Sequence, residues 1–306
     1  MKQILTLLTL TTALLSCKET PLQRADNDFN VTVEIPAFQK NKPTILFDEG
    51  HNNFHTTTGL YQPFANLVKN DGYELKTLTN LVTQEVLNST RIYVIANAKG
   101  KGDLNDDNAF SEVETEIIKN WVMEGGSLLL IADHFPFGSA VENLANKIGV
   151  EFQKGIVQDS MYYDRKSNDQ SQLEFSKENR LLIEHAITNG VNKVITFTGQ
   201  SIKCQDSSCI SFLSLSDVAY DLTPITKVTK DGNDTRVEVT YVNPQSAKGR
   251  SQGVALKLGN GRIVCLGEAA MLTAQKNRDD NKVGMNYNPE NKKLALNILH
   301  WLTEKE

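Results

Sequence analysis

The sequence contains no hydrophobic run long enough to cross a membrane as a folded helix, since the apolar stretch near its start, Ile4–Leu15, is too short to span a bilayer. It also has no basic stripe, because its 32 Lys and Arg residues are interspersed among 37 Asp and Glu residues. Without such a stripe the chain cannot neutralise a run of phosphates, which excludes nucleic acid as a partner. Tryptophan is scarce as well. Its two residues fall on predicted amphipathic helices, so no aromatic platform for sugars is evident.

The first residues are typical of an export signal, with Lys2 followed by the apolar run. That run ends Leu14-Leu15-Ser16-Cys17, which resembles the lipobox of bacterial lipoproteins, where a small residue precedes a cysteine that is lipidated and becomes N-terminal after cleavage. We therefore predict that residues 1–16 are a lipoprotein signal peptide and that Cys17 carries the lipid. The alternative is a general secretory signal with a coincidental cysteine.

The residues after the cysteine indicate the destination. Lys18 stands where an aspartate would favour retention in the inner membrane, and Cys17-Lys18-Glu19 resembles the lysine-acid signals that send some lipoproteins to the outer surface. We expect a protein of the cell outer membrane, with the membrane as its partner through the anchor at Cys17. Removing residues 1–16 leaves 31 basic and 37 acidic side chains, a formal charge of −6.

Three cysteines remain after the anchor. Cys204 and Cys209 lie in one polar loop and could form a small disulfide in an oxidising compartment, while Cys265 lies in a predicted strand. Three free thiols are the alternative, because spacing alone does not determine geometry.

The pattern along the chain predicts one α/β domain. Residues 17–42 are polar and lack a sustained period, as in a tether, and from Pro43 to residue 306 apolar strands alternate with amphipathic helices. The strands predicted at 44–47, 92–96 and 128–132 are apolar throughout, as expected in a parallel sheet covered on both faces. Beyond residue 200, hairpin signals such as Gly259-Asn260-Gly261 predict antiparallel extension strands.

Polar residues follow four of the predicted strands, where parallel sheets form their binding sites. His51, Asp133, His134 and Glu268 are the candidate catalytic residues for acid-base chemistry. Because acids from two strands could meet a histidine pair at i, i+4 spacing, a divalent metal is the alternative, with Asp48, His51, His55 and Asp133 as its ligands. Helix capping by these residues is the non-functional interpretation.

Amide side chains near the same strand ends are candidate substrate-binding residues: Asn53, Asn97, Gln275 and Asn286. Gln275 precedes a long polar loop, residues 277–289, and Asn286 lies within it. This loop could act as a lid or be a solvated connection. These groups suit a hydroxylated ligand.

Several of these strings also carry a resemblance: 47–55 (FDEGHNNFH), 121–137 around Gly125-Gly126 and Ala132-Asp133-His134, 266–271 (LGEAAM), and the terminal 296–301 (LNILHW). Together they resemble uncharacterised bacterial lipoproteins with a class I glutamine amidotransferase-like, flavodoxin-like domain of unknown function. The resemblance implies a doubly wound, mostly parallel sheet over residues 43–306 but no reaction. True amidotransferases place a nucleophilic cysteine at the elbow that is Ala132-Asp133-His134 here, so that chemistry is not expected.

Two functions remain open. One is a hydrolase acting on an extracellular carbohydrate or a related substrate during polysaccharide degradation. The other is a non-catalytic glycan-binding or scaffold lipoprotein. The side-chain positions discriminate between them. His51 or His55 packed in the core, or Glu268 at the opposite edge of the sheet, would favour the binding protein over the enzyme.

Overall fold

The computed structural model describes residues 22–206, 208–231 and 234–304. The predicted signal peptide, residues 1–16, and the predicted lipidation site, Cys17, lie outside these ranges. Within them, no helix combines the length and the apolar character that crossing a membrane requires.

A nine-stranded sheet forms the centre of the molecule, in the order β3-β2-β4-β5-β15-β14-β10-β6, with β11 also paired to β14. Its parallel strands are β2 (Thr44–Asp48), β3 (Glu74–Leu78), β4 (Ile92–Ala96), β5 (Ser127–Ile131) and β15 (Gly261–Leu266). Its antiparallel strands are β6 (Val150–Phe152), β10 (Ile202–Cys204), β11 (Ile210–Ser214) and β14 (Ser251–Leu258). The parallel strands have the 2-1-3-4-5 order of doubly wound sheets. The predicted α/β class, with a largely parallel sheet and antiparallel strands toward the C-terminus, is confirmed.

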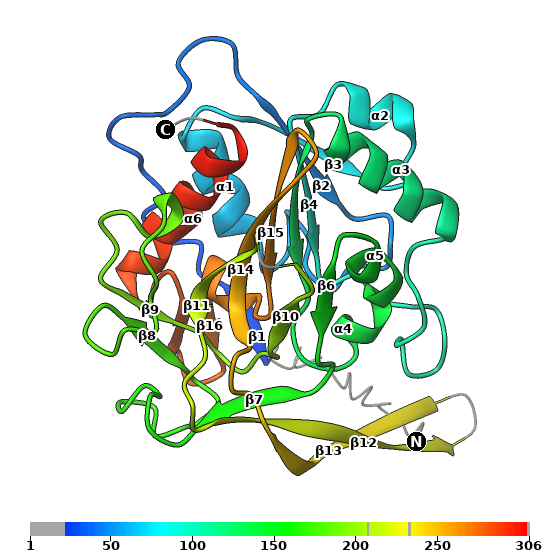
Figure 1. The fold of residues 1–306 in the computed structure, drawn as a ribbon, viewed down its shortest axis with the longest axis vertical. Helices are drawn as coiled ribbons and strands as arrows, with labels where there is room; N and C mark the ends of the chain where they lie inside the picture. The colour runs from blue at the N-terminus through cyan, green and yellow to red at the C-terminus, as the bar shows by residue number, and fades with distance from the viewer. Residues whose placement is uncertain (1–21, 207, 232–233, 305–306) are drawn as a thin grey trace, which may run out of the picture.

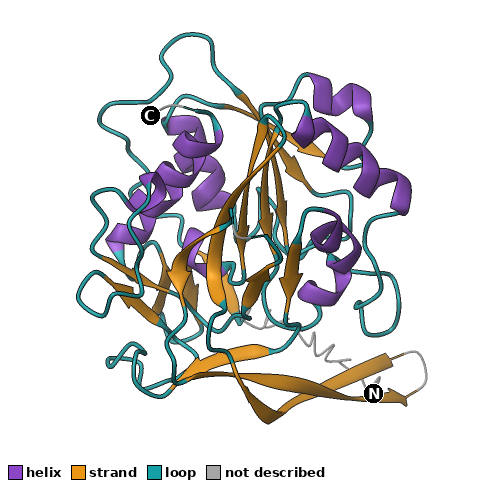
Figure 2. Cartoon of the chain, viewed as in Figure 1, coloured by secondary structure: helices purple, strands orange, loops and turns teal. Residues whose placement is uncertain are grey.

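Helices cover both faces of this sheet (Figures 1 and 2). One face carries α1 (Gln62–Asn70) and α6 (Pro289–Leu302), and the other carries α2 (Gln84–Asn88), α3 (Glu112–Met123), α4 (Phe137–Ala140) and α5 (Glu142–Lys147). Successive side chains of a strand point to opposite faces, so Phe47 joins the core beneath α1 and α6 while Leu46 joins the other core. Burial on both faces explains the absence of alternation in these strands.

Two local predictions differ in outcome. The capping box of Ser111 and Glu114 begins α3 as the sequence indicates. The apolar spacing of Leu181–Ile187 predicts a helix there, and this prediction is wrong, because only a 3₁₀ turn, η1 (Ala186–Thr188), forms. Leu182 instead bridges to Leu213 like a strand residue, so tertiary pairing overrides the apolar spacing. Nearby, β8 (Glu174–Ser176) and β9 (Lys193–Ile195) pair with each other outside the main sheet.

The N-terminal segment lies against the domain from residue 22 onward. There β1 (Gln23–Ala25) pairs with β16 (Ala274–Asn277), which also pairs with β17 (Lys282–Gly284). The part of the predicted tether that the structure describes, residues 22–42, therefore belongs to the folded body.

A long ribbon runs across the lower edge of the sheet in Figure 1. It consists of β12 (Ala219–Asp231) and β13 (Asp234–Ser246), with β7 (Ile156–Asp159) paired to the base of β12. Cys204 and Cys209 are joined by a disulfide, so these two are not free thiols. Cys265 is buried in β15, where burial raises the pKa of its thiol.

A carboxyl group at the root of the ribbon makes stability depend on pH. Burial raises the pKa of Asp221 to about 6, although Ser201 and Arg250 act in the opposite direction. Between pH 4 and 6 the folded chain therefore binds more protons at Asp221 than the unfolded chain, and stability falls as the pH rises through this window. We expect Asp221→Asn to reduce the loss of unfolding free energy between pH 4 and 7 by up to about 3 kcal/mol, measured by urea denaturation. An unchanged slope would assign the pH dependence to other groups.

Candidate functional site

The four predicted strand ends meet at the carboxyl edge of the sheet. Asp48 is the last residue of β2, Asn97 follows β4, Asp133 follows β5 and Glu268 follows β15. The side chains divide into two groups, because some turn inward to the core beneath α3 and others line an open cavity. We call the first group the buried triad and the second the edge cavity.

The buried triad consists of Asp48, His51 and Glu114. His51 Nδ1 lies 2.8 Å from Asp48 Oδ1, and its Nε2 lies 2.9 Å from Glu114 Oε1. Its ring stacks on Phe110 with 4.0 Å between ring centroids. All three polar side chains are buried. Since an ionised carboxylate only accepts hydrogen bonds, this arrangement favours an imidazole that carries a proton on both nitrogens.

Electrostatics agree with that protonation state. Burial lowers the pKa of His51, but the hydrogen bonds and charges of Asp48 and Glu114 outweigh it and raise the pKa overall. The imidazole of His51 is therefore held in the core by two acids and does not line the edge cavity, and its predicted catalytic role stays a prediction. Asn53, a predicted substrate-binding residue, also bonds to the buried triad, because its amide donates to Asp48 Oδ2 at 3.0 Å.

The edge cavity has a volume of about 500 Å³ and opens at the same edge of the sheet. Its apolar lining includes four phenylalanine rings, and its polar lining combines amides, histidines and one acid. The lining residues are Gln23, Phe54, His55, Asn97, Asp133, His134, Phe135, Pro136, Phe137, Gln172, Phe197, Thr198, Ala270, Gln275 and Val283. Of the predicted site residues, His55, Asn97, Asp133, His134 and Gln275 therefore share one cavity.

His134 and Asp133 form the wall that follows β5. His134 Nδ1 lies 2.8 Å from the carbonyl oxygen of Phe135, which can only accept, so Nδ1 carries a proton and Nε2 is the nitrogen left outside this hydrogen bond. The backbone N–H of His134 donates to Asp133 Oδ1 at 2.7 Å, and Asn97 Oδ1 accepts the N–H of Asp133 at 2.9 Å. Burial raises the pKa of Asp133, although His134 and these hydrogen bonds act against it.

Glu268 lies behind this wall and does not line the cavity. Its carboxylate accepts the N–H groups of Ala270 at 2.6 Å and Met271 at 2.8 Å, at the start of η2 (Ala270–Leu272). Burial raises its pKa well above the ordinary value, and the charge of Asp133 raises it further. Glu268 thus caps a backbone turn and does not line the cavity, unlike Asp133 and His134 among the predicted catalytic residues.

Two side chains of the lining carry buried polar atoms without a hydrogen-bond partner among the described residues, His55 Nδ1 and Gln275 Oε1. Burial, together with the charge of His134, lowers the pKa of His55 to about 3, so this imidazole is neutral near pH 7. The cavity therefore presents an uncharged imidazole and an amide oxygen beside apolar rings. An unpaired buried polar atom carries a desolvation cost of about 1–3 kcal/mol, which a ligand hydroxyl can offset.

The predicted metal ligands do not assemble. Among the described residues, no group of three or more His, Cys, Asp or Glu side chains is arranged to hold a metal ion. Asp48 and His51 belong to the buried triad, whereas His55 and Asp133 line the edge cavity. The predicted set is wrong because the chain turns His51 toward α3 and His55 toward the cavity, in spite of their i, i+4 spacing.

Asn286, another predicted substrate-binding residue, also lies outside the edge cavity. Its amide donates to Asp26 Oδ2 at 2.9 Å and to the carbonyl of Gln275 at 2.8 Å, so it fixes the N-terminal segment. The lining residues that were not predicted as site residues include Phe54, Phe197, Gln172 and Thr198. Gln172 and Thr198 come from irregular segments without a periodic signal.

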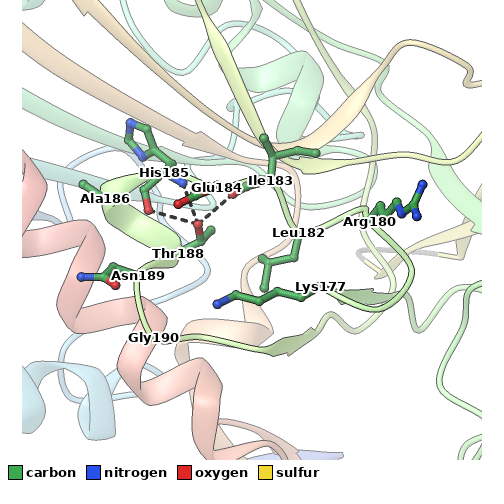
Figure 3. Close-up of a pocket in the computed structure, with 10 residues that line it drawn as sticks. All are labelled: Lys177, Arg180, Leu182, Ile183, Glu184, His185, Ala186, Thr188, Asn189 and Gly190. Carbon is green, nitrogen blue, oxygen red and sulfur yellow. Dashed lines mark hydrogen bonds between the residues drawn. The ribbon is translucent and has the colours of Figure 1, made fainter.

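A larger hollow, of about 700 Å³, lies away from the strand ends among residues 177–190 (Figure 3). Lys177 reaches across it, whereas Arg180 points away from it. Its lining includes a single acid, Glu184, and a single histidine, His185. His185 caps η1, because its Nδ1 accepts the N–H of Ile187 at 3.2 Å. The edge cavity lies at the carboxyl ends of the parallel strands, where such sheets form their sites, and is therefore the candidate site.

No protein-family model matches the chain, and no curated protein matches it. Among solved structures, the mmIFT52 N-terminal domain superposes with a TM-score of 0.60 at 16% identity, over 85% of this chain and 97% of that one. At this identity the likeness concerns the fold alone. Weaker likenesses, which indicate no function, include a ThuA-like protein from Bacteroides uniformis (TM-score 0.44, 11% identity, 90% and 94% covered). A GMP synthase component from Thermoplasma acidophilum is similar at TM-score 0.43 and 9% identity, over 87% of this chain and 100% of that chain.

Proposed function

We propose that this chain is an outer-membrane lipoprotein of the amidotransferase-like fold that binds a carbohydrate in the edge cavity. The observation that supports it best is the lining of that cavity, in which phenylalanine rings stand beside amides and a neutral imidazole. Aromatic rings contact the apolar faces of sugars, and amide or imidazole groups bond their hydroxyls. The neutral lining of His55 and Gln275 suits an uncharged polyhydroxylated ligand better than an ion.

The position of His51 favours binding over catalysis. The hydrolase hypothesis placed this imidazole at the centre of the reaction, yet both of its nitrogens are occupied by buried carboxylates. Cys265 offers no nucleophile either, because it is buried in β15 with a raised thiol pKa. A recognition pocket needs neither group.

The binding function is tested with the purified mature chain, carrying Cys17→Ala so that it is soluble, on an array of neutral and acidic oligosaccharides. We expect a defined neutral sugar to bind, and titration calorimetry then gives its affinity. Phe54 is 53% exposed and lines the cavity, so Phe54→Ala should weaken binding about tenfold with little effect on folding.

Leu81 provides the matched control. It is a large apolar residue, 62% exposed, and does not line the cavity, so Leu81→Ala should leave the affinity unchanged. Equal loss in both variants would mean that general surface hydrophobicity, not the edge cavity, holds the sugar. Failure of every oligosaccharide to bind would contradict the proposal itself.

A hydrolase acting on the same class of ligand is the second candidate, favoured by one observation. His134 Nδ1 donates to a backbone carbonyl, so Nε2 is the ring nitrogen in the cavity wall, next to Asp133, that this mechanism would use as proton acceptor. In this mechanism His134 would activate water for attack on an ester of the bound sugar. His134→Gln should then abolish product release while the affinity for the sugar stays within about threefold of the wild type. Absence of any product with the wild-type chain would leave the binding function alone.

A further inference from the structure

The described part of the N-terminal segment begins beside the edge cavity. The position of the cavity relative to the membrane therefore depends on the proposed anchor at Cys17. Gln23 in β1 both pairs with Asn277 in β16 and lines the cavity. Figure 1 shows β1 beside β16, near the lower ends of the parallel strands. The first described residues of the chain therefore lie at the rim of the candidate site.

Several independent contacts hold this segment in place. Three residue pairs join β1 to β16, and Arg24 forms an ion pair with Asp280. Asp26 is buried and lies 2.7 Å from Lys276 Nζ. Further along, the Lys292 ammonium donates to the carbonyl oxygens of Asn30 at 2.9 Å and Thr32 at 2.8 Å.

The electrostatics of Asp26 agree with a firm attachment. Burial raises the pKa of its carboxyl, but the hydrogen bonds from Lys276 and Asn286 outweigh burial and lower the pKa overall. The carboxylate is thus the charged partner of Lys276 on β16 and accepts from Asn286 in the loop after β17. Gln23, at the rim of the cavity, is therefore fixed to the domain.

The short distance along the chain to Cys17 then limits the orientation of the whole domain. Residues 18–22 are the five residues between Cys17 and Gln23, so a fully extended chain spans at most about 21 Å between them. A globular chain of this length has a radius of gyration of about 19 Å and, as a sphere, a radius of about 25 Å. This stretch of chain is shorter than the radius of the molecule. Gln23 and the rim of the cavity therefore lie in the half of the domain that is nearer the membrane.

We propose that the edge cavity faces the membrane that holds the anchor, and that its ligand is the saccharide headgroup of a glycolipid in that membrane. This inference rests on the proposed lipidation of Cys17 and on sugar binding by the cavity. Of the ligands that share this chemistry, a headgroup at the bilayer surface lies within reach of a cavity mouth held about 20 Å or less from the anchor. A soluble glycan is the other source, and the tests below distinguish the two.

The orientation is tested by energy transfer from a single dye-labelled cysteine to dye-labelled lipids in vesicles that hold the lipidated protein. No native cysteine competes for the label, since Cys17 is lipidated, Cys204 and Cys209 form a disulfide and Cys265 is buried. Without ligand, Phe54→Cys at the cavity should give at least about twofold more transfer than Asn260→Cys, which lies in the turn at the opposite edge of the sheet. Equal transfer from both positions would overturn the proposed orientation.

The ligand source is tested by a 20-residue Gly-Ser spacer inserted between Thr20 and Pro21. The chain between Cys17 and Gln23 lengthens from 5 to 25 residues, so the effective concentration of the cavity at the membrane falls about tenfold. The probe is a phosphatidylcholine vesicle containing 5 mol% of a lipid that carries the sugar found on the array. We expect the spacer to weaken binding to this lipid about tenfold and to leave binding of the soluble sugar unchanged.

Failure of this inference can be told apart from failure of the proposed function. If palmitate labels the protein and the soluble sugar binds, but the spacer has no effect on vesicle binding, the membrane-borne ligand is wrong while the proposed function stands. If the soluble sugar binds neither form, the binding function itself is wrong. If Cys17 carries no lipid, the orientation has no basis and is also wrong.

Discussion

His51→Leu should destabilise the protein by about 3–5 kcal/mol, although this residue does not touch the candidate ligand. The substitution removes the cation between two buried carboxylates, Asp48 and Glu114, and leaves both without their ionic partner. Breaking a buried ion pair from one side is costly because the remaining charge stays desolvated. In a domain of this size the thermal midpoint should fall on the order of 10 °C, measured by calorimetry.

His134→Leu is the matched control. The His134 imidazole bonds only to the neighbouring backbone carbonyl, so its loss should change the unfolding free energy by about 1 kcal/mol or less. A triple variant, Asp48→Asn, His51→Leu and Glu114→Gln, removes the charges together and should be less destabilised than His51→Leu alone. If the triple variant is instead the least stable, packing rather than unpaired charge explains the effect.

The buried triad should also make the unfolding free energy of the protein depend on pH. The pKa of His51 is raised in the folded chain, so the stability it contributes is fully present below about pH 6.5 and is lost as the pH rises through the folded value. His51→Leu should abolish this part of the decline in unfolding free energy on the alkaline side. A decline of equal slope in both proteins would place the titrating group elsewhere.

The parallel sheet was predictable because each strand is an apolar run that ends abruptly in polar residues. Asp48, Asn97, Asp133 and Glu268 follow such runs, and parallel topology alone brings their backbones to one edge. The direction of each side chain was not predictable in the same way. It depends on partners distant in sequence, such as Glu114, which lies 63 positions after His51.

Glu114 shows why a correct local interpretation can still be incomplete. Its capping box with Ser111 was evident from spacing, and one carboxylate oxygen, Oε2, does accept the N–H of Ser111 at 3.0 Å. The other oxygen, Oε1, binds His51, which no short-range pattern indicates. The same limit explains Gln172 and Thr198, which reach the cavity from segments that lack either helical or strand periodicity.

Cys17→Ala should remove the protein from the outer membrane, the largest effect expected of any single substitution here. In the proposed lipoprotein, acyl chains on Cys17 carry the attachment. Each buried methylene contributes about 0.8 kcal/mol, and more than one chain is needed for a stable anchor. Labelling with radioactive palmitate should therefore disappear, and the outer-membrane fraction should lose the protein.

If Cys17→Ala leaves residues 1–16 uncleaved, the protein can still adhere to the inner membrane through Ile4–Leu15. The fractionation experiment therefore needs a second variant. Replacing residues 1–17 by a cleavable secretory signal gives the same domain without either the apolar run or the cysteine. This form should appear in the soluble periplasmic fraction with its thermal midpoint unchanged, because the segment that packs on the domain, residues 22–42, is intact. Wild-type levels of this form in the outer membrane would mean that the folded surface, rather than a lipid on Cys17, binds the membrane.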